Sequence, residues 1–348
     1  MTRDLAVLKS PDYASFAADH NGSLPYRIDH LRDAGFVLRY SDASFRRPWN
    51  RPAVRRMVGR LERVGVPFLQ TLALVRRIVR APSTLAMFES EGHFLAALRG
   101  VVPPLRRRRL VVIACWLAEI APRLTPAKRN LYRWLYRQVD TVIVFSSNQR
   151  SILTSTLGIP TERIAVVPFG IDVDELAGLE TSENGSVLAV GRDAGRDWPT
   201  LFAAVEGTGW PVTVACRPGQ LAGLTPPREV EVVGYVDRAK YLELLANASV
   251  VVIATRDLAY PTGQSVLLEA MGLAKACVVT STEAMADYAV DGSNALTVPV
   301  ADERGLQLAI RRLLDDDALR RTLGDEAKAL VRSRCNAATM WQSIADVI

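Results

Sequence analysis

Short apolar runs alternate with helical segments along the chain, and this alternation is the feature that most restricts the fold. In the first half the apolar runs are residues 5–10, 36–40, 84–88, 110–115, 141–146 and 164–169. The segments between them have apolar residues at helical spacing, notably 25–34, 52–80, 91–99, 127–138 and 147–156. Almost continuously apolar strands that alternate with helices are typical of parallel sheets covered on both faces. The first half is therefore predicted to be α/β.

The same pattern starts again after residue 186. Six more apolar runs are found at residues 187–191, 212–216, 230–234, 250–254, 276–280 and 295–299. Helical spacing between and after them predicts helices at 197–205, 238–246, 264–273, 305–314, 317–333 and 337–347. The polar stretch between the halves, residues 171–186, is predicted to be an interdomain linker.

The length of the chain supports two cores rather than one. Single cores rarely exceed about 250–300 residues, and this chain has 348. We therefore predict two Rossmann-like, doubly wound domains, residues 1–170 and 187–335, that face each other across a cleft. The last segment, residues 336–348, is expected to form a helix that crosses back to the first domain.

Charge is distributed unevenly between the halves. Residues 1–178 carry 27 Lys and Arg against 15 Asp and Glu, whereas the remainder carries 16 against 22. This asymmetry predicts an anionic partner for the first half. The basic stretches 46–82 and 106–109 fit either peripheral contact with an anionic membrane or helices packed on the sheet with their Arg side in water. Because no nucleic-acid-binding motif accompanies them, we expect no nucleic acid partner.

The remaining composition limits location and cofactors. No apolar run approaches the roughly 18 residues needed to span a membrane, and the first ten residues lack an apolar signal core. We therefore expect a cytoplasmic protein that at most touches the inner face of the membrane. The four Cys and three His residues show no metal-ligand spacing, so we expect no metal and no bound cofactor. The Ala- and Arg-rich composition fits a bacterial protein.

A loop and helix in the second half form the first candidate binding site. The helix is apolar except for Glu269, and the loop residues expected to contact a ligand are Thr262, Gly263, Gln264 and Ser265. Free N–H groups at a helix start attract anions, and glycine permits a close approach of the backbone. Glu269 would lean toward the same ligand, and a carboxylate suits ribose hydroxyls rather than phosphates. The pattern predicts a nucleotide, with a partly exposed surface glutamate as the alternative.

A second candidate is the strand end and loop with the sequence VLAVGRDAGRDWPTL, residues 187–201. The predicted strand ends at Gly191 and is followed by Arg192 and Arg196. Two guanidinium groups at the carboxyl end of a strand can grip phosphate oxygens. The alternative is a solvated, salt-bridged loop. The glycine spacing is not that of the Gly-x-Gly-x-x-Gly dinucleotide motif.

Four stretches, in this order, resemble the retaining nucleotide-sugar glycosyltransferases of glycosyltransferase family 4, which have the GT-B fold. They are residues 166–176, 190–204, 232–255 and 261–280, the last followed by YAVDGSNALTVPVAD. The match is strongest over about 165–335, and the first 160 residues match only in pattern. The resemblance implies that a nucleotide diphosphate sugar binds the second domain and a hydroxyl acceptor the first. It also implies that the loop with Tyr235 and Val236 contacts the base through its backbone.

Two positions depart from the family pattern. The family often shows two glutamates across the signature, of which Glu269 matches the second. Pro261 stands at the place of the first, whose role in the family is to position the donor sugar. Gln264 or the backbone next to it is the candidate substitute. Many members also have a histidine after the strand that here is followed by Cys115 and Trp116.

The first half offers fewer candidate residues. His20, Asn21 and Gly22 follow the first predicted strand, where this architecture exposes residues to the acceptor. His93 lies at the start of a predicted helix that would face the cleft, which makes it a candidate catalytic residue. A histidine packed into the structure is the alternative for His93.

The sequence thus predicts a metal-independent, retaining glycosyltransferase of hexosyltransferase type. It would move a sugar from a nucleotide diphosphate sugar to a hydroxyl of a glycolipid or a specialised metabolite. Arg192 and Arg196, with the helix start at Gly263, would stabilise charge on the departing diphosphate. Two alternatives remain: a GT-B sugar-nucleotide epimerase, which needs no acceptor, and a catalytically silent protein that binds a nucleotide sugar or a membrane. Acceptor-dependent turnover separates the first from the other two.

Overall fold

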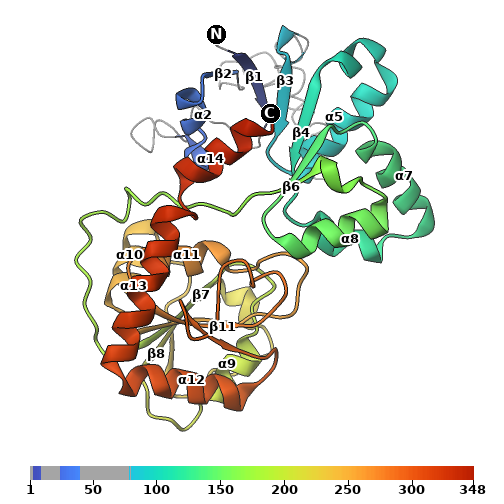
Figure 1. The fold of residues 1–348 in the computed structure, drawn as a ribbon. Helices are drawn as coiled ribbons and strands as arrows, with labels where there is room; N and C mark the ends of the chain where they lie inside the picture. Colours follow the sequence, from blue (N-terminus) through green and yellow to red (C-terminus); the bar gives the residue numbers. More distant parts are fainter. Residues whose placement is uncertain (1–2, 9–23, 40–77, 79) are drawn as a thin grey trace, which may run out of the picture. The chain divides into compact units, whose positions relative to one another are not determined.

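The structure is a computed structural model that describes residues 3–8, 24–39, 78 and 80–348. The chain forms two compact units (Figure 1). The first contains the chain up to Val167 together with Met340–Ile348, and the second contains Pro168–Thr339. Each unit has a six-stranded sheet in which every pair of neighbouring strands is parallel. The prediction of two doubly wound α/β halves is therefore confirmed.

The first sheet has the strand order β2-β1-β3-β4-β5-β6. Its strands are β1 (Arg3–Leu8), β2 (Phe36–Arg39), β3 (Ser83–Ala86), β4 (Arg109–Ile113), β5 (Thr141–Val144) and β6 (Ile164–Val166). Its α-helices are α2 (His30–Asp33), α5 (Glu89–Val101), α6 (Leu117–Ile120), α7 (Pro126–Tyr136) and α8 (Ser147–Leu157). Short 3₁₀ turns are η1 (Pro25–Arg27), η3 (Pro103–Arg107), η4 (Ala121–Arg123) and η5 (Thr161–Arg163).

One predicted helix of the first half is shorter than expected. The segment 25–34 forms η1 and then α2 rather than one continuous helix. The reason is local, because Tyr26 and Arg27 have φ values of 57° and 55°, a left-handed conformation that interrupts a right-handed helix. Most of the predicted Arg-rich helix at 52–80 lies outside the described residues.

The second sheet has the strand order β12-β11-β10-β7-β8-β9. Its strands are β7 (Val187–Gly191), β8 (Val212–Cys216), β9 (Val230–Val232), β10 (Val250–Ile253), β11 (Ala276–Thr280) and β12 (Leu296–Val298). The helices that follow or connect them are α9 (Trp198–Val205), η6 (Pro218–Leu221), α10 (Arg238–Asn247), α11 (Gln264–Gly272), α12 (Glu303–Asp315) and α13 (Asp317–Ser333).

Two hydrophobic layers cover the faces of the second sheet. Side chains of a strand alternate between the faces, so Leu188 and Val190 lie in the layer that contains residues of α10, α11 and α13. Val187 and Ala189 lie in the opposite layer, with residues of α9 and α12. This arrangement explains why β7 is apolar at every position, and it leaves the ends of the strands as the place for polar side chains.

The end of the chain returns to the first unit. The last helix is α14 (Ala337–Asp346), and residues from Met340 onward belong to the first unit. The indole Nε1 of Trp341 donates to the carbonyl of Tyr26 over 2.6 Å, and Trp341 is 1% exposed. Arg109 Nη2 donates to the carbonyl of Val347 over 3.1 Å. These contacts attach the C-terminal residues to the first unit.

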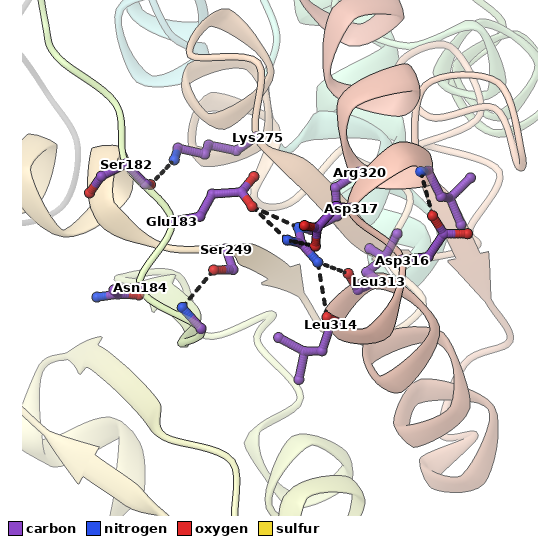
Figure 2. Close-up of polar contacts among 12 residues, drawn as sticks. Ser182, Glu183, Asn184, Ser249, Lys275, Leu313, Leu314, Asp316, Asp317 and Arg320 are labelled. Atoms are coloured by element: carbon purple, nitrogen blue, oxygen red, sulfur yellow. Dashed lines mark hydrogen bonds and ion pairs between the residues drawn. The ribbon is translucent and has the colours of Figure 1, made fainter.

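The segment expected as a linker, residues 171–186, clusters with the second unit. Ile171 and Leu176 are buried in its core. Figure 2 shows the rest of the attachment, where Lys275 Nζ donates to the Ser182 carbonyl over 2.7 Å and Glu183 pairs with Arg320 over 2.6 Å. The polar residues of this segment therefore form hydrogen bonds and ion pairs with the second unit. In the described part of the chain, no helix has the length and apolarity required to cross a bilayer.

Candidate functional site

The order of the second sheet points to one place for a ligand. The chain leaves β7 in one direction to form β8 and β9, and it returns to the other side of β7 to form β10, β11 and β12. Ligands of open α/β sheets bind at the carboxyl ends of the strands where the order reverses. In this unit that place lies between β7 and β10.

The loop after β7 is folded onto the end of β10. The backbone N–H of Asp197 donates to the Ala254 carbonyl over 3.0 Å, and that of Arg256 donates to the Gly195 carbonyl over 2.8 Å. Arg196, between these contacts, forms an isolated bridge with Thr255. The loop GRDAGRD is therefore held as an ordered turn beside β10, which excludes the alternative of a freely solvated loop for Arg196.

Arg196 is a buried cation with donors to spare. Its side chain lies between two glycines, since a Cβ placed on Gly191 or on Gly263 would collide with the Arg196 side chain. The residue is 4% exposed, and its Nε and Nη1 have no hydrogen-bond partner among the described residues. Burial lowers the pKa of this guanidinium to about 10, although the negative charge of the nearby Asp193 raises it. Arg196 is thus charged at neutral pH and available to an anion.

The start of α11 lies against the same guanidinium. Gly263 is the residue before α11 and has φ of 85°, a conformation that favours glycine. The first N–H groups of a helix lack intrahelical acceptors and attract negative charge. Two side-chain oxygens beside Gly263, Thr262 Oγ1 and Gln264 Oε1, are buried without a partner in the described part of the chain. The helix N–H groups and these two oxygens thus surround Arg196 with further hydrogen-bonding atoms.

Glu269 lies on α11 and is held by α10. The Tyr241 hydroxyl donates to Glu269 Oε2, and Arg238 Nη1 pairs with Oε1 over 2.8 Å. Arg238 is itself fixed by Glu175, over 2.8 and 2.6 Å. Burial raises the pKa of the Glu269 carboxyl, and Arg238 opposes that shift. Glu269, which the sequence predicts to bind the ribose, therefore has a carboxylate of fixed orientation. The Glu269 side chain is only 14% exposed.

The two arginines that the sequence grouped together occupy different environments. Arg192 is exposed and lies over the ring of Tyr235, with its Cζ 4.5 Å from the ring centre. Tyr235 is 60% exposed. Val236, the next residue, packs partly buried against the core of the second unit. Arg192, which follows β7, and Tyr235, which follows β9, thus form a cation–π pair, whereas Arg196 alone lies beside Gly263.

His93 is enclosed by tyrosine side chains in the first unit. Its Nε2 lies 3.2 Å from the Tyr136 hydroxyl, and the ring meets that of Tyr132 edge-on, with 4.6 Å between the ring centres. Burial lowers the pKa of His93 to about 4. The surroundings are those of a packed neutral imidazole, which was the alternative for this residue, and its catalytic role stays a prediction.

The buried His93 makes the stability of the first unit depend on pH. A histidine in an unfolded chain has a pKa near 6.5, so folding favours the neutral form of His93. Its contribution is fully present above about pH 6.5 and is lost as the pH falls through 4, on the order of 3 kcal/mol in total. NMR titration of the imidazole signals, with His93→Phe to assign the signal, should show His93 unprotonated at pH 5. Titration of that signal near 6.5 would contradict the burial of His93.

Where the family often has a histidine, this chain presents an aromatic stack. Trp116 follows β4, is 43% exposed, and stacks on Phe88 with 5.8 Å between ring centres. The buried Glu89 accepts from the backbone N–H groups of Trp116 and Leu117. Burial raises the pKa of the Glu89 carboxyl. The acceptor candidates His20, Asn21 and Gly22 lie outside the described residues.

Several residues near the site escaped the sequence analysis. Asp193 accepts from the Tyr260 hydroxyl over 2.9 and 3.0 Å and lies close enough to affect the Arg196 charge. Tyr241 and Arg238 hold Glu269, and the only sequence signal for them is their spacing of three on one predicted helix. Among the described residues, no three His, Cys, Asp or Glu side chains are grouped as metal ligands would be.

Comparison with known families matches both halves of the chain. A family model described as Glycosyltransferase Family 4 matches residues 35–175, and one described as Glycosyl transferases group 1 matches residues 203–316. The first half, whose resemblance rested on pattern alone, is thus matched as well. Glycogen synthase of Mycobacterium tuberculosis is 26% identical over 234 residues, which cover 61% of this chain and 53% of that protein. The chain spans about half the length of the curated relatives it matches.

Solved structures resemble the chain over nearly its full length. Anabaena HepE in complex with UDP-glucose has a TM-score of 0.65 and 16% identity, covering 100% of this chain and 99% of HepE. Sucrose-phosphate synthase from Thermosynechococcus elongatus has a TM-score of 0.70 and 16% identity, covering 99% of this chain and 98% of that one. At these identities the likeness shows the fold. The chain has the GT-B fold, and its two halves resemble glycosyltransferases of family 4.

Proposed function

We propose that the chain is a retaining glycosyltransferase that takes a sugar from a nucleotide diphosphate sugar without a metal ion. The observation that carries this proposal is Arg196, a buried guanidinium with unused donors that lies against the start of α11. Burying an unpaired charge costs several kcal/mol, so a ligand of opposite charge is the simplest partner for it. A diphosphate offers that charge and enough oxygens for both the guanidinium and the helix N–H groups.

The same groups would serve the chemical step. Negative charge grows on the diphosphate as the bond to the sugar breaks, and donors fixed in a buried site stabilise this charge without having to reorganise. Arg196 and the α11 start would do the work that a divalent cation performs in metal-dependent transferases. In the proposed reaction the acceptor hydroxyl attacks from the side of the leaving group and gives its proton to a phosphate oxygen.

The donor sugar needs a second set of contacts, because Pro261 replaces the expected glutamate. Thr262 Oγ1 and Gln264 Oε1 are buried oxygens without partners in the described part of the chain. Sugar hydroxyls can donate to such acceptors, and a buried acceptor left without a donor costs about 1–3 kcal/mol. We assign the sugar contacts to Thr262 and Gln264. The HepE structures hold UDP and UDP-glucose, which supports UDP-glucose as the first donor to test.

Glu269 is expected to hold the ribose. The Glu269→Gln variant should therefore bind UDP more weakly, by a factor of about ten or more. The reason is that hydrogen bonds to charged groups contribute about 1.5–3 kcal/mol. The 2′,3′-dideoxy form of UDP should show no such loss. Arg238→Met is the matched control, because it also breaks the Glu269–Arg238 pair but keeps the carboxylate. Calorimetric titration of the two variants checks this. Equal losses for UDP and for its dideoxy form would remove the ribose contact from Glu269.

Turnover tests the proposed reaction. Release of nucleoside diphosphate is measured from UDP-glucose, GDP-mannose and dTDP-glucose in the presence of EDTA, with and without a panel of sugar and glycolipid acceptors. The proposal predicts release that depends on an acceptor and a product with the anomeric configuration of the donor, read by NMR. Inversion, or activity only with added cation, would contradict the proposed mechanism. Isomerised donor without acceptor would favour the epimerase, and binding without turnover would favour the silent protein.

A further inference from the structure

Two helices of the first unit, α5 and α7, carry apolar side chains that are not covered. Val101 at the end of α5 is 70% exposed, and Leu131 and Trp134 on α7 are 52% and 37% exposed. Trp134 packs over Gly100, because a Cβ placed there would meet the indole ring at 2.5 Å. Val101 is therefore next to Trp134, and Leu131 lies one helical turn before it. Helices α5 and α7 pack against each other, and Figure 1 shows α7 at an edge of the first unit.

Cations surround this apolar patch. Arg106 Nη2 donates to the Gly100 carbonyl over 2.7 Å, which places its guanidinium beside Val101 and Trp134. At the end of α7, Arg137 is exposed and lies one helical turn after Trp134, on the same side of the helix. Among the described residues, neither Arg106 nor Arg137 pairs with a carboxylate. We call this set of residues, Val101, Arg106, Leu131, Trp134 and Arg137, the α7 patch.

The charge around the patch has one sign. Between residues 99 and 137 the chain has ten Lys and Arg and a single acidic residue, Glu119. Glu119 is paired with Arg123 over 2.5 Å, and Arg99 is paired with Asp140 over 2.5 Å. Among the described residues, the other eight cations of this stretch have no carboxylate partner. A field of this kind attracts an anionic surface. Exposed apolar side chains among arginines match the interfacial region of a bilayer, where tryptophan and arginine place an apolar body in the lipid and a polar end among headgroups.

We propose that the α7 patch docks the protein on an anionic lipid bilayer. Leu131, Val101 and the Trp134 ring enter the boundary between headgroups and acyl chains, and Arg106 and Arg137 contact lipid phosphates. Each basic residue near an anionic membrane surface contributes about 1 kcal/mol, so several of them with a small apolar insertion give reversible binding. This surface belongs entirely to the first unit and does not depend on the proposed transferase activity.

Vesicle sedimentation of the full chain tests the proposal. The protein should sediment with vesicles of phosphatidylglycerol and phosphatidylcholine and stay in solution with phosphatidylcholine alone. Binding should weaken as salt shortens the Debye length, from about 10 Å at 0.1 M to about 3 Å at 1 M. Leu131→Glu places a negative charge in the apolar centre of the patch, and it should weaken binding at least about tenfold. Arg137→Glu should weaken it too.

Leu308→Glu is the matched control. Leu308 is also a leucine on a helix and is also 52% exposed, but it lies on α12 of the second unit. It should sediment like the unmodified protein. Urea unfolding followed by circular dichroism shows whether both units of each variant remain folded. Failure of the unmodified protein to sediment, or equal binding to neutral vesicles, would overturn the proposal.

Two further outcomes would assign the patch or the membrane contact differently. If Leu131→Glu binds vesicles as the unmodified protein does, the membrane contact lies elsewhere, with the basic stretch 46–82 as the next candidate. If the protein forms dimers that Leu131→Glu but not Leu308→Glu separates, and no variant binds vesicles, the α7 patch is a contact between two copies of the chain. Either result would overturn lipid docking through the α7 patch.

Discussion

Replacing Arg196 with methionine is expected to weaken nucleoside diphosphate binding strongly and, at the same time, to stabilise the second unit. The guanidinium is buried and its Nε and Nη1 have no partner among the described residues, so the fold carries the cost of an unpaired charge. Methionine is unbranched and apolar and can occupy the space that the Arg196 side chain fills between Gly191 and Gly263. We expect the free energy of unfolding to rise by about 1–3 kcal/mol. Affinity for UDP should fall about a hundredfold or more.

The combination of the two effects separates a binding role from a structural one. If Arg196 served only packing, its replacement would lower the stability of the second unit and leave the affinity for UDP unchanged. Arg312→Met is the control, since Arg312 is exposed on α12 and should change neither quantity. Urea unfolding and calorimetric titration on the same samples measure both. A less stable Arg196→Met variant with unchanged UDP affinity would contradict the assignment of this residue.

Replacing Arg320 with methionine is expected to have the opposite effect on stability. Arg320 is also buried, but its donors are occupied, as Figure 2 shows. Nη1 donates to the carbonyls of Leu313 and Leu314 over 2.5 and 3.0 Å, and Nε and Nη2 donate to Glu183 over 2.9 and 2.6 Å. The variant leaves the last carbonyls of α12 without this donor and frees the segment that contains Glu183. We expect a loss of about 2–4 kcal/mol.

The affected region can be located within the second unit. The two units can unfold separately, so hydrogen exchange along a urea titration should be read on peptides from α12 and α13. Arg320→Lys keeps the charge but lacks the planar fork, and it should recover only part of the loss. Arg332→Met changes an exposed residue of the same helix and should have little effect. Unchanged protection in Arg320→Met would mean that the network in Figure 2 contributes little to stability.

The strands and helices of the second unit were predicted closely from the sequence. Apolar strands and Asp residues that precede helices are local signals, which a short stretch of sequence contains. Asp197, Asp237 and Asp316 each accept from a backbone N–H in the first turn of the following helix. The candidate loops at Gly191–Arg196 and Gly263–Ser265 were also found from sequence, since glycine, arginine and a helix start have recognisable chemistry.

What the sequence could not show depends on packing between distant segments. Arg192 and Arg196 look equivalent in the sequence, and only the fold of the loop onto β10 buries one and exposes the other. Tyr241 reaches Glu269 because α10 and α11 are neighbours in the second unit, which no local pattern specifies. The segment around Glu183 was read as a linker because it is polar, yet its polar groups bond to the unit that follows it.

The most direct test of the central claim is a calorimetric titration of UDP and of uridine in the presence of EDTA. If the diphosphate binds to Arg196 and the start of α11, UDP should bind with a chelator present, and uridine should bind far more weakly. GDP and dTDP in parallel identify the preferred base. If UDP binds no better than uridine, or only when a divalent cation is supplied, a cation-free diphosphate site at Arg196 is contradicted.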